Sequence, residues 1–304
     1  MKKYKIAVCV LTYYPQLEGL MATLYSIIKQ KNLVFQIIIS DDGSQENCFE
    51  EAKKFLDEAG FKDYKFVASE QNRGTVKNLE QALLASEAEY VKAISPGDCL
   101  TNETTLSEWI DHLEKSGKRW SFSNAHYYAK DEEGKSVFYP CYANPQLVSP
   151  YLHNKDVQCR WNYVILDDIA LGAATLCERD LMLRFVQEIT DKVKYAEDNM
   201  YRLMMFDGYV ADFFPQHAIL YEYGSGISTS NSDIWQNRLK EDWEATNTIM
   251  ISRTAVDLLQ SRMKKVLVNR QKDGRVLRFV RRVIEKGRVA ITLKRYLNKR
   301  LTSC

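Results

Sequence analysis

The first hundred residues alternate between two hydrophobic patterns. Continuous apolar runs rich in β-branched side chains are typical of strands buried on both faces, and they occupy residues 5–12, 34–40, 64–68 and 90–94. Apolar positions at helical spacing fill the intervals, at residues 20–30, 49–59, 74–86 and 102–116. This alternation predicts an α/β fold, with a parallel sheet covered by helices on both faces.

Polar clusters follow the predicted strands at the point where each strand ends. Thr12 ends the first strand, Asp41-Asp42-Gly43-Ser44 follows the second, and Ser95-Pro96-Gly97-Asp98 follows the fourth. Sheets of this kind bind ligands at the carboxyl ends of their strands. The sequence therefore predicts a ligand site at this edge of the sheet.

The pattern becomes less regular after Trp120. We expect a hairpin from residues 120–129 and 136–139, and loops with short strands over residues 141–170. Helices at 178–189 and 197–206 and strands at 209–214 and 218–223 follow. Beyond Ser232 the chain is predicted to be helical almost to its end, with breaks near Gly274 and Gly287.

The net charge of +2 hides a strong asymmetry. Residues 262–300 hold 15 of the 42 basic residues and only two of the 40 acidic ones, so residues 1–261 carry a net charge of −11. Apolar residues recur at helical spacing within the basic tail. Such a tail suggests an anionic membrane surface as partner of residues 275–304. The alternative is a helix that packs its apolar stripe on the body and leaves a solvated basic face.

Several classes of function lack their sequence signals. The four histidines and seven cysteines show no metal-ligand spacing, and there is no Gly-x-Gly-x-x-Gly or Walker loop. No hydrolase triad or nucleic-acid motif is recognisable, so no nucleic-acid partner is expected. An odd cysteine count and the absence of a signal-like start favour a cytoplasmic location, peripheral on the inner face of the plasma membrane if the tail binds it.

The order of motifs resembles the nucleotide-binding half of family 2 glycosyltransferases. It consists of Thr12-x-Tyr14, Asp41-Asp42-Gly43-Ser44, Asn72-x-Gly74 and Gly97-Asp98, each in its place relative to a strand. The resemblance implies the GT-A fold, a Rossmann-like nucleotide-diphospho-sugar transferase fold, over residues 1–230. Residues 1–100 would form the nucleotide-binding half and 101–230 the acceptor half. Residues 231–304 would be a basic, helical C-terminal extension.

The resemblance also implies a set of donor-binding residues around the strand ends. Taken alone, Asp41-Asp42 could simply cap the next helix, and Lys77 could be an exposed helix residue. The family's donor contacts would fall on Thr12, Tyr14, Asp41, Asp42, Asn72, Arg73, Gly74, Lys77 and Gly97.

A metal role follows in the same way for Asp98. The family typically has an Asp-x-Asp-type cluster here, of which this chain keeps only the final Asp. One carboxylate with phosphate oxygens and water can hold Mg²⁺ or Mn²⁺ as cofactor. The alternative is that Asp98 caps the next helix.

The catalytic roles implied by the resemblance fall on an acidic pair, Asp198 as the base and Glu197 as its support. Acids are favoured in the first turn of any helix, so the pair also has a purely structural explanation. Gly172 and Ala173 match a segment that approaches the acceptor and donor sugar, although a tight backbone crossing would also need small residues. A late flexible loop is implied at Gly224, Gly226 and Ser228.

The implied activity transfers a sugar from a nucleotide-diphosphate donor, with a UDP-sugar favoured, to a hydroxyl of a glycan or lipid-linked acceptor. The transfer would be metal-assisted and invert the anomeric centre, as in bacterial surface polysaccharide synthesis. Two alternatives are a non-catalytic nucleotide- or glycan-binding module of the same fold and a sugar nucleotidyltransferase. A homodimer through the C-terminal helices stays open.

Overall fold

The computed structural model describes residues 2–131, 133–139, 145, 147–224, 226–227 and 232–272. Its first half is a parallel sheet in the order β3-β2-β1-β4. The strands are β1 (Tyr4–Thr12), β2 (Phe35–Asp41), β3 (Tyr64–Ala68) and β4 (Ala88–Ile94), and the connecting helices are α1 (Leu17–Ile28), α2 (Phe49–Glu58) and α3 (Thr75–Ala85). The predicted parallel α/β arrangement of this half is confirmed.

The second half extends the same sheet with mixed strand directions. β8 (Thr175–Glu178) pairs antiparallel with β4 and with β6 (Trp120–Lys130). β9 (Asp212–Glu222) then pairs parallel with β6, and the two-residue β5 (Cys99–Leu100) pairs antiparallel with β9. The expected hairpin is present as β6 and β7 (Ser136–Phe138).

Two sequence predictions in this half are wrong. The expected strands at 209–214 and 218–223 are one strand, β9, whose register with β6 shifts between Ser123 and Ala125. Residues 141–170, expected to be loops and short strands, include the helices α5 (Ser149–Leu152) and α6 (Asp156–Ile165). Six of the ten α6 residues are buried, including Arg160 and Asn162, so its polar and apolar positions do not mark an exposed and a buried face.

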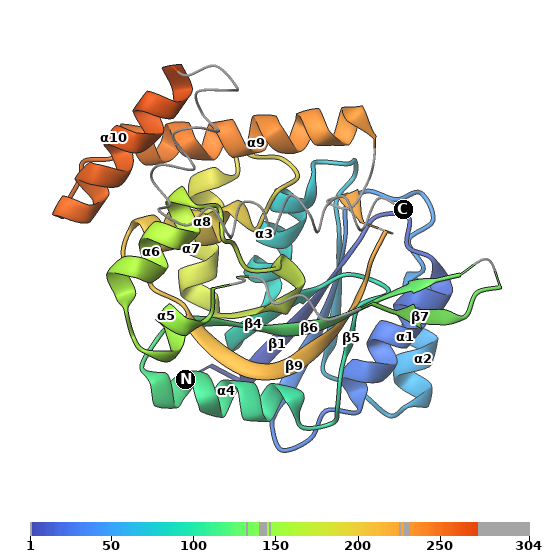
Figure 1. Cartoon of the computed structure of the whole chain (residues 1–304). Coiled ribbons are helices and arrows are strands. Elements are labelled where there is room, and N and C mark those ends of the chain that lie inside the picture. Colours follow the sequence, from blue (N-terminus) through green and yellow to red (C-terminus); the bar gives the residue numbers. More distant parts are fainter. Residues whose placement is uncertain are drawn as a thin grey trace.

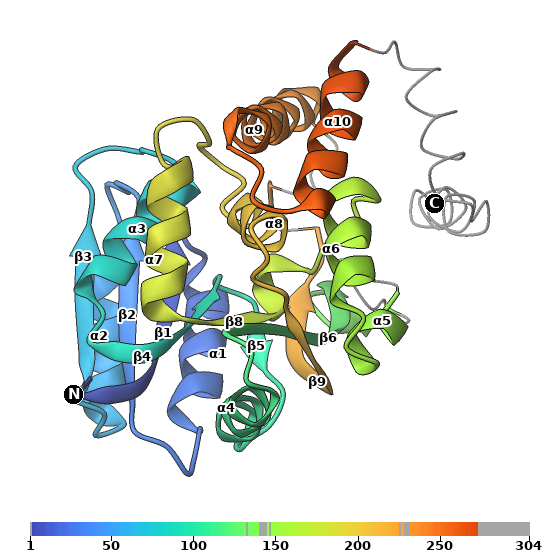
Figure 2. The same cartoon turned by 90° about the vertical axis from the view of Figure 1, so that its left-hand side faces the viewer.

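Helices cover both faces of the sheet and define two cores (Figures 1 and 2). One core lies under α1, α2 and α4 (Thr105–Ser116), and the other under α3, α6, α7 (Arg179–Ile189) and α8 (Asn199–Phe206). Because every helix of the first half follows a strand and runs back along the sheet, the carboxyl ends of β1, β2 and β4 are left accessible to loops.

The last two described helices belong to the second core. α9 (Asp233–Ser252) lies across α8 at the top of Figure 1, and α10 (Leu258–Lys272) packs beside α6. Their Ile249, Met250, Met263 and Leu267 are buried in the same cluster as α8. Among the described helices, none combines the length and apolar character needed to cross a membrane. Residues 275–304, expected to contact a membrane, lie outside the described part of the chain.

Candidate active site

The turn after β2 is built around the carboxylate of Asp41. Its Oδ2 accepts hydrogen bonds from Thr12 Oγ1 and Ser44 Oγ, both at 2.9 Å, and its Oδ1 accepts one from the Ser44 amide at 2.7 Å. The amide of Tyr14 donates to Ser44 Oγ at 2.7 Å, while the Tyr14 ring is exposed. Thr12 and Asp41 are buried, so this network joins the ends of β1 and β2 inside the protein and leaves the Tyr14 ring exposed to solvent.

The neighbouring Asp42 holds the loop before α3. Its two oxygens accept the backbone N–H groups of Arg73 and Gly74, each at 2.8 Å. Burial raises the pKa of Asp42, and these two N–H donors oppose that effect. Gly43 packs against residues 71 and 72, since a Cβ on it would lie 2.8 Å from the amide nitrogen of Asn72. The donor residues predicted on either side of this turn are thus brought together.

Arg73 and Lys77 lie on the rim of this region. The Arg73 guanidinium donates to Ser69 Oγ and Gln81 Oε1, and Lys77 is half-buried on α3. One structural residue beside them was not predicted. Asn78 is buried, donates to the carbonyl of Thr12 at 3.2 Å and accepts from Ser40 Oγ at 2.6 Å. It therefore links α3 to the ends of β1 and β2.

The turn after β4 brings Gly97 and Asp98 against β9. Asp98 is 3% exposed, and its Oδ1 accepts the amide of Glu222 at 2.9 Å. Burial raises the pKa of Asp98 to about 7. Gly97 has a φ of 97°, and a Cβ there would lie 2.1 Å from Oε2 of Glu222. The Glu222 carboxylate thus occupies the space into which a side chain at position 97 would project.

Neither Glu222 nor Lys92 was predicted to belong to the site. Lys92 of β4 is fully buried, and its ammonium donates to the carbonyls of Ala93 and Ala173, the latter at 2.5 Å. Burial lowers the pKa of Lys92 to about 7, and the nearby charge of Asp98 opposes this. The only sequence signal for Glu222 is an acid at the end of a predicted strand. Lys92 lies in a predicted strand without any such signal.

Lys92 connects the Asp98 turn with the predicted acceptor segment. Gly172 and Ala173 form a short 3₁₀ turn (Gly172–Ala174) before β8. A Cβ on Gly172 would lie 3.3 Å from the Cβ of Asp198 and 3.7 Å from its Oδ2. The segment therefore runs from the carbonyl bound by Lys92 to the side chain of the predicted base.

Glu197 and Asp198 lie in the turn that leads into α8, and both side chains keep some exposed surface. Burial raises the pKa of both carboxyls, and the Asp198 charge raises that of Glu197 further. The guanidinium of Arg202, one turn along α8, favours the charged form of Asp198. A carboxylate with a raised pKa beside a glycine can accept a proton from a group bound against that glycine.

The predicted late loop is described only in part. Tyr223 donates its amide to the carbonyl of Tyr128 at 2.7 Å, which holds the loop's start against β6. Gly224 is exposed with a φ of 98°, and Gly226 is half-buried. Ser228 lies outside the described residues. Within the described ranges, no group of three or more His, Cys, Asp and Glu side chains forms a metal site.

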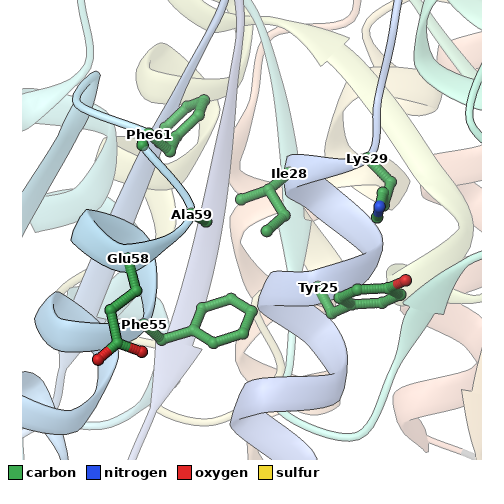
Figure 3. Close-up of a pocket in the computed structure, with 8 residues that line it drawn as sticks. Tyr25, Ile28, Lys29, Phe55, Glu58, Ala59 and Phe61 are labelled. Carbon is green, nitrogen blue, oxygen red and sulfur yellow. The ribbon is translucent and has the colours of Figure 1, made fainter.

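A separate pocket lies at the other end of the sheet, near the amino ends of the strands. It has a volume of about 530 Å³ and opens between the C-terminal halves of α1 and α2 (Figure 3). Phe55 and Tyr25 line it together with Lys29 and Glu58. Because α1 and α2 run back from the carboxyl ends of the strands, this pocket is remote from the predicted site.

Comparisons with known proteins agree with this architecture. Residues 8–169 match the family model described as glycosyl transferase family 2, and no curated protein sequence matches the chain. S. aureus TarS 1–349 in complex with UDP-GlcNAc has a TM-score of 0.60 and 16% identity, covering 88% of this chain and 72% of that chain.

A second solved structure is similar over more of the chain. The mannosyltransferase PcManGT from Pyrobaculum calidifontis, in complex with GDP-Man and Mn²⁺, has a TM-score of 0.59 and 13% identity. The match covers 96% of this chain and 82% of that chain. These likenesses confirm the predicted GT-A fold, and the family model covers more than half of the residues. The chain therefore belongs to glycosyl transferase family 2.

Proposed function

We propose that this glycosyltransferase moves a sugar from a UDP-sugar to a hydroxyl of a glycan or lipid-linked acceptor, with inversion of the anomeric centre. The product would belong to surface polysaccharide synthesis. The observation that carries the proposal is Asp198, a carboxylate with a raised pKa that packs against Gly172. The donor class is supported by the UDP-GlcNAc and GDP-Man bound in the similar structures.

In the proposed reaction, Asp198 acts on the acceptor. Its carboxylate takes the proton of the acceptor hydroxyl as the oxygen attacks C1 of the donor sugar. The new C1–O bond forms while the bond from C1 to the diphosphate oxygen breaks, and the nucleoside diphosphate leaves with the electron pair. Attack from the opposite face inverts the anomeric centre. Glu197 and Gly172 shape the space in which the hydroxyl meets Asp198.

Donor binding is assigned to the strand ends. Thr12, Tyr14, Asp42 and the loop at 72–74 surround the turn after β2, and each carboxylate there has further lone pairs for ribose or base N–H and O–H groups. Arg73 and Lys77 supply positive charge at the rim for a diphosphate. These side chains come from three separate segments, as expected for a bound nucleotide that spans the sheet edge.

A divalent cation, Mn²⁺ or Mg²⁺, fits the turn after β4. Asp98 and Glu222 provide two hard oxygen donors there, because the Glu222 carboxylate occupies the space beside Gly97, next to Asp98 in the chain. The burial of Asp98 disfavours its charged form, and a bound cation would offset that. When bound, the cation stabilises the negative charge of the leaving diphosphate.

The organisation of the chain is part of the proposal. Residues 1–230 would form the catalytic domain, with the nucleotide half in 1–100 and the acceptor half in 101–230. The basic segment 275–304 would hold the protein at the inner face of an anionic membrane, close to a lipid-linked acceptor.

The test separates donor binding from transfer. Calorimetry measures UDP binding with and without Mn²⁺, and release of UDP from UDP-GlcNAc and other UDP-sugars measures turnover. We expect Asp198→Asn to bind UDP like the wild type and to lower turnover by at least about a hundredfold. Asp98→Ala should lose the Mn²⁺-dependent part of UDP binding. Unchanged turnover in Asp198→Asn would exclude Asp198 as the base.

A further inference from the structure

The side chain of Asp242 on α9 is engaged by a loop far away in the sequence. It is 5% exposed, and its Oδ1 accepts the amide of Lys194 at 2.9 Å. Its Oδ2 accepts the amides of Tyr195 at 2.7 Å and Ala196 at 2.9 Å. One buried carboxylate thus fixes three consecutive N–H groups, and the next two residues along the chain are Glu197 and Asp198.

The same loop contacts the donor side on its other edge. The carbonyl of Lys194 accepts the amide of Val76 at 3.2 Å, at the start of α3. A Cβ on Gly74 would lie 2.3 Å from that carbonyl oxygen, and the Gly74 amide is held by Asp42. Residues 194–196 are therefore held between Asp242 and the loop that carries the proposed donor residues.

α9 also contacts the chain on the far side of the acidic pair. The Arg202 guanidinium lies 3.3 Å from the ring centre of Trp243 and donates to Asn247 at 2.9 Å. On the near side, the ring of Tyr195 meets the ring of Trp235 at 5.0 Å, nearly at right angles. One helix thus holds the segments that precede and follow Glu197 and Asp198 (Figure 1).

A buried carboxylate is a costly way to pack a helix. An apolar side chain would serve packing alone, whereas an Asp must recover its desolvation through hydrogen bonds. Three charge-assisted hydrogen bonds to one loop provide that, and they also fix the loop's path in a way that apolar contacts would not. The arrangement therefore fixes the backbone position of residues 194–196 more closely than stabilising the packing of α9 would require.

We propose that Asp242 is a positioning residue of this transferase, which sets where the Asp198 carboxylate lies by holding residues 194–196. The inference rests on the proposed role of Asp198. It makes α9 part of the catalytic apparatus, although in the sequence α9 comes after all the proposed donor and acceptor residues.

The test compares Asp242→Asn with a matched control, Thr246→Val. Asn has the same shape, but only one of its two terminal atoms accepts hydrogen bonds, so at least one of the three amides loses its acceptor and meets an N–H donor instead. Thr246 lies one turn along α9 and is fully buried, and its hydroxyl donates to the carbonyl of Asp242 at 2.9 Å. The control removes one buried hydrogen bond of α9 and leaves the loop untouched.

We expect Asp242→Asn to lower kcat for UDP release from a UDP-sugar by between about tenfold and a hundredfold, with the Kd for UDP within about twofold. Hydrogen exchange of the amides of 194–198 should become faster in this variant and stay unchanged in Thr246→Val. Equal exchange rates and kcat in the two variants would overturn the inference alone. A wild type without turnover would overturn the proposed function as well.

If the Asp242→Asn chain does not fold, Asp242→Glu serves as the second variant. It keeps the charge, but the added methylene moves the carboxylate away from the positions at which it accepts the amides of residues 194–196. A fall in kcat with unchanged UDP affinity is again expected, together with faster exchange of the loop. Unchanged kcat and exchange in this variant would count against the proposal.

Discussion

At the residue scale, Gly74 shows how little freedom the backbone has between the proposed donor residues and the proposed base. Its φ of 95° and ψ of 161° place it in a region that only glycine adopts readily. Its Cα also faces the carbonyl of Lys194 so closely that a methyl group would overlap it. Any residue other than glycine at position 74 would therefore be destabilised both by backbone strain and by steric overlap.

The effect of the overlap is measurable against a second glycine. We expect Gly74→Ala to lower the free energy of unfolding by about 3 kcal/mol or more, because it adds steric overlap to the unfavourable φ. Gly60→Ala is the control, since its φ is 73° but a Cβ there meets nothing within 4 Å, so about 1 kcal/mol is expected. Urea unfolding measures both. Equal losses of unfolding free energy in the two variants would show that the loop at Lys194 moves away from the added methyl group without destabilising the protein.

Asp198 leads to a prediction about pH. Burial raises its folded-state pKa above the ordinary 3.8, so the folded protein holds this proton more tightly than the unfolded chain. The stability that the bound proton provides is complete below pH 3.8 and is lost as the pH rises through the folded pKa. Asp198→Asn should therefore be more stable than the wild type at pH 8, and the gain should vanish near pH 4. Since the side chain keeps some exposed surface, we expect a gain on the order of 1 kcal/mol.

A carboxylate of opposite shift provides the control. Burial tends to raise the pKa of Asp257, but the Gln260 amide and the Arg160 guanidinium donate to it and bring its pKa below the ordinary value. Asp257→Asn should therefore be less stable than the wild type at pH 8, with the loss fading in acid. Denaturant unfolding at both pH values measures the two variants. The same sign in both would contradict the assignment for Asp198.

The sequence could indicate the residues on one side of the site better than those on the other. Thr12, Asp41 and Asp42 lie at the ends of strands with a strong hydrophobic signal, so their meeting at the carboxyl ends of the sheet was predictable. Glu222 reaches the site because β9 pairs with β6. Lys92 reaches it because its buried ammonium donates to the carbonyl of Ala173. No local pattern encodes such contacts between distant segments.

At the scale of elements, the same distinction explains which helices and strands were predicted. β1, β2 and β4 are continuous apolar runs, and α4 has one buried face, so periodicity identifies them. α6 buries polar and apolar residues alike, including the guanidinium of Arg160, which donates to the carbonyls of Met205 and Phe206. Its helical character depends on partners from α8, which the local sequence does not contain.

β9 illustrates the opposite error. Pro215 and Gln216 interrupt its apolar pattern and suggest a turn between two strands. In the structure the strand continues, and the irregularity is absorbed as a register shift against β6 near Asn124. The continuous strand matters for the candidate site, because the full length of β9 brings Glu222 against Gly97 and Asp98.

At the scale of the whole molecule, charge and packing divide the C-terminal part of the chain at different places. Buried Met263 and Leu267 join α10 to the core with α8, so packing continues to at least residue 267. The concentration of positive charge lies mostly beyond. Residues 275–304 hold 10 basic residues and one acidic residue, so without them the net charge of +2 becomes −7.

This division predicts the result of a deletion. A chain ending at residue 274 should keep its stability and UDP-sugar turnover in detergent-free solution, because the residues that close the core remain. It should lose binding to vesicles that contain phosphatidylglycerol, since a surface potential attracts basic segments by about 1 kcal/mol per charge near the surface. Vesicle flotation of both chains measures this, with phosphatidylcholine vesicles and added salt as controls. If the shortened chain floats with anionic vesicles as well as the full chain does, the acidic body must carry the membrane contact, and the tail would then need another anionic partner.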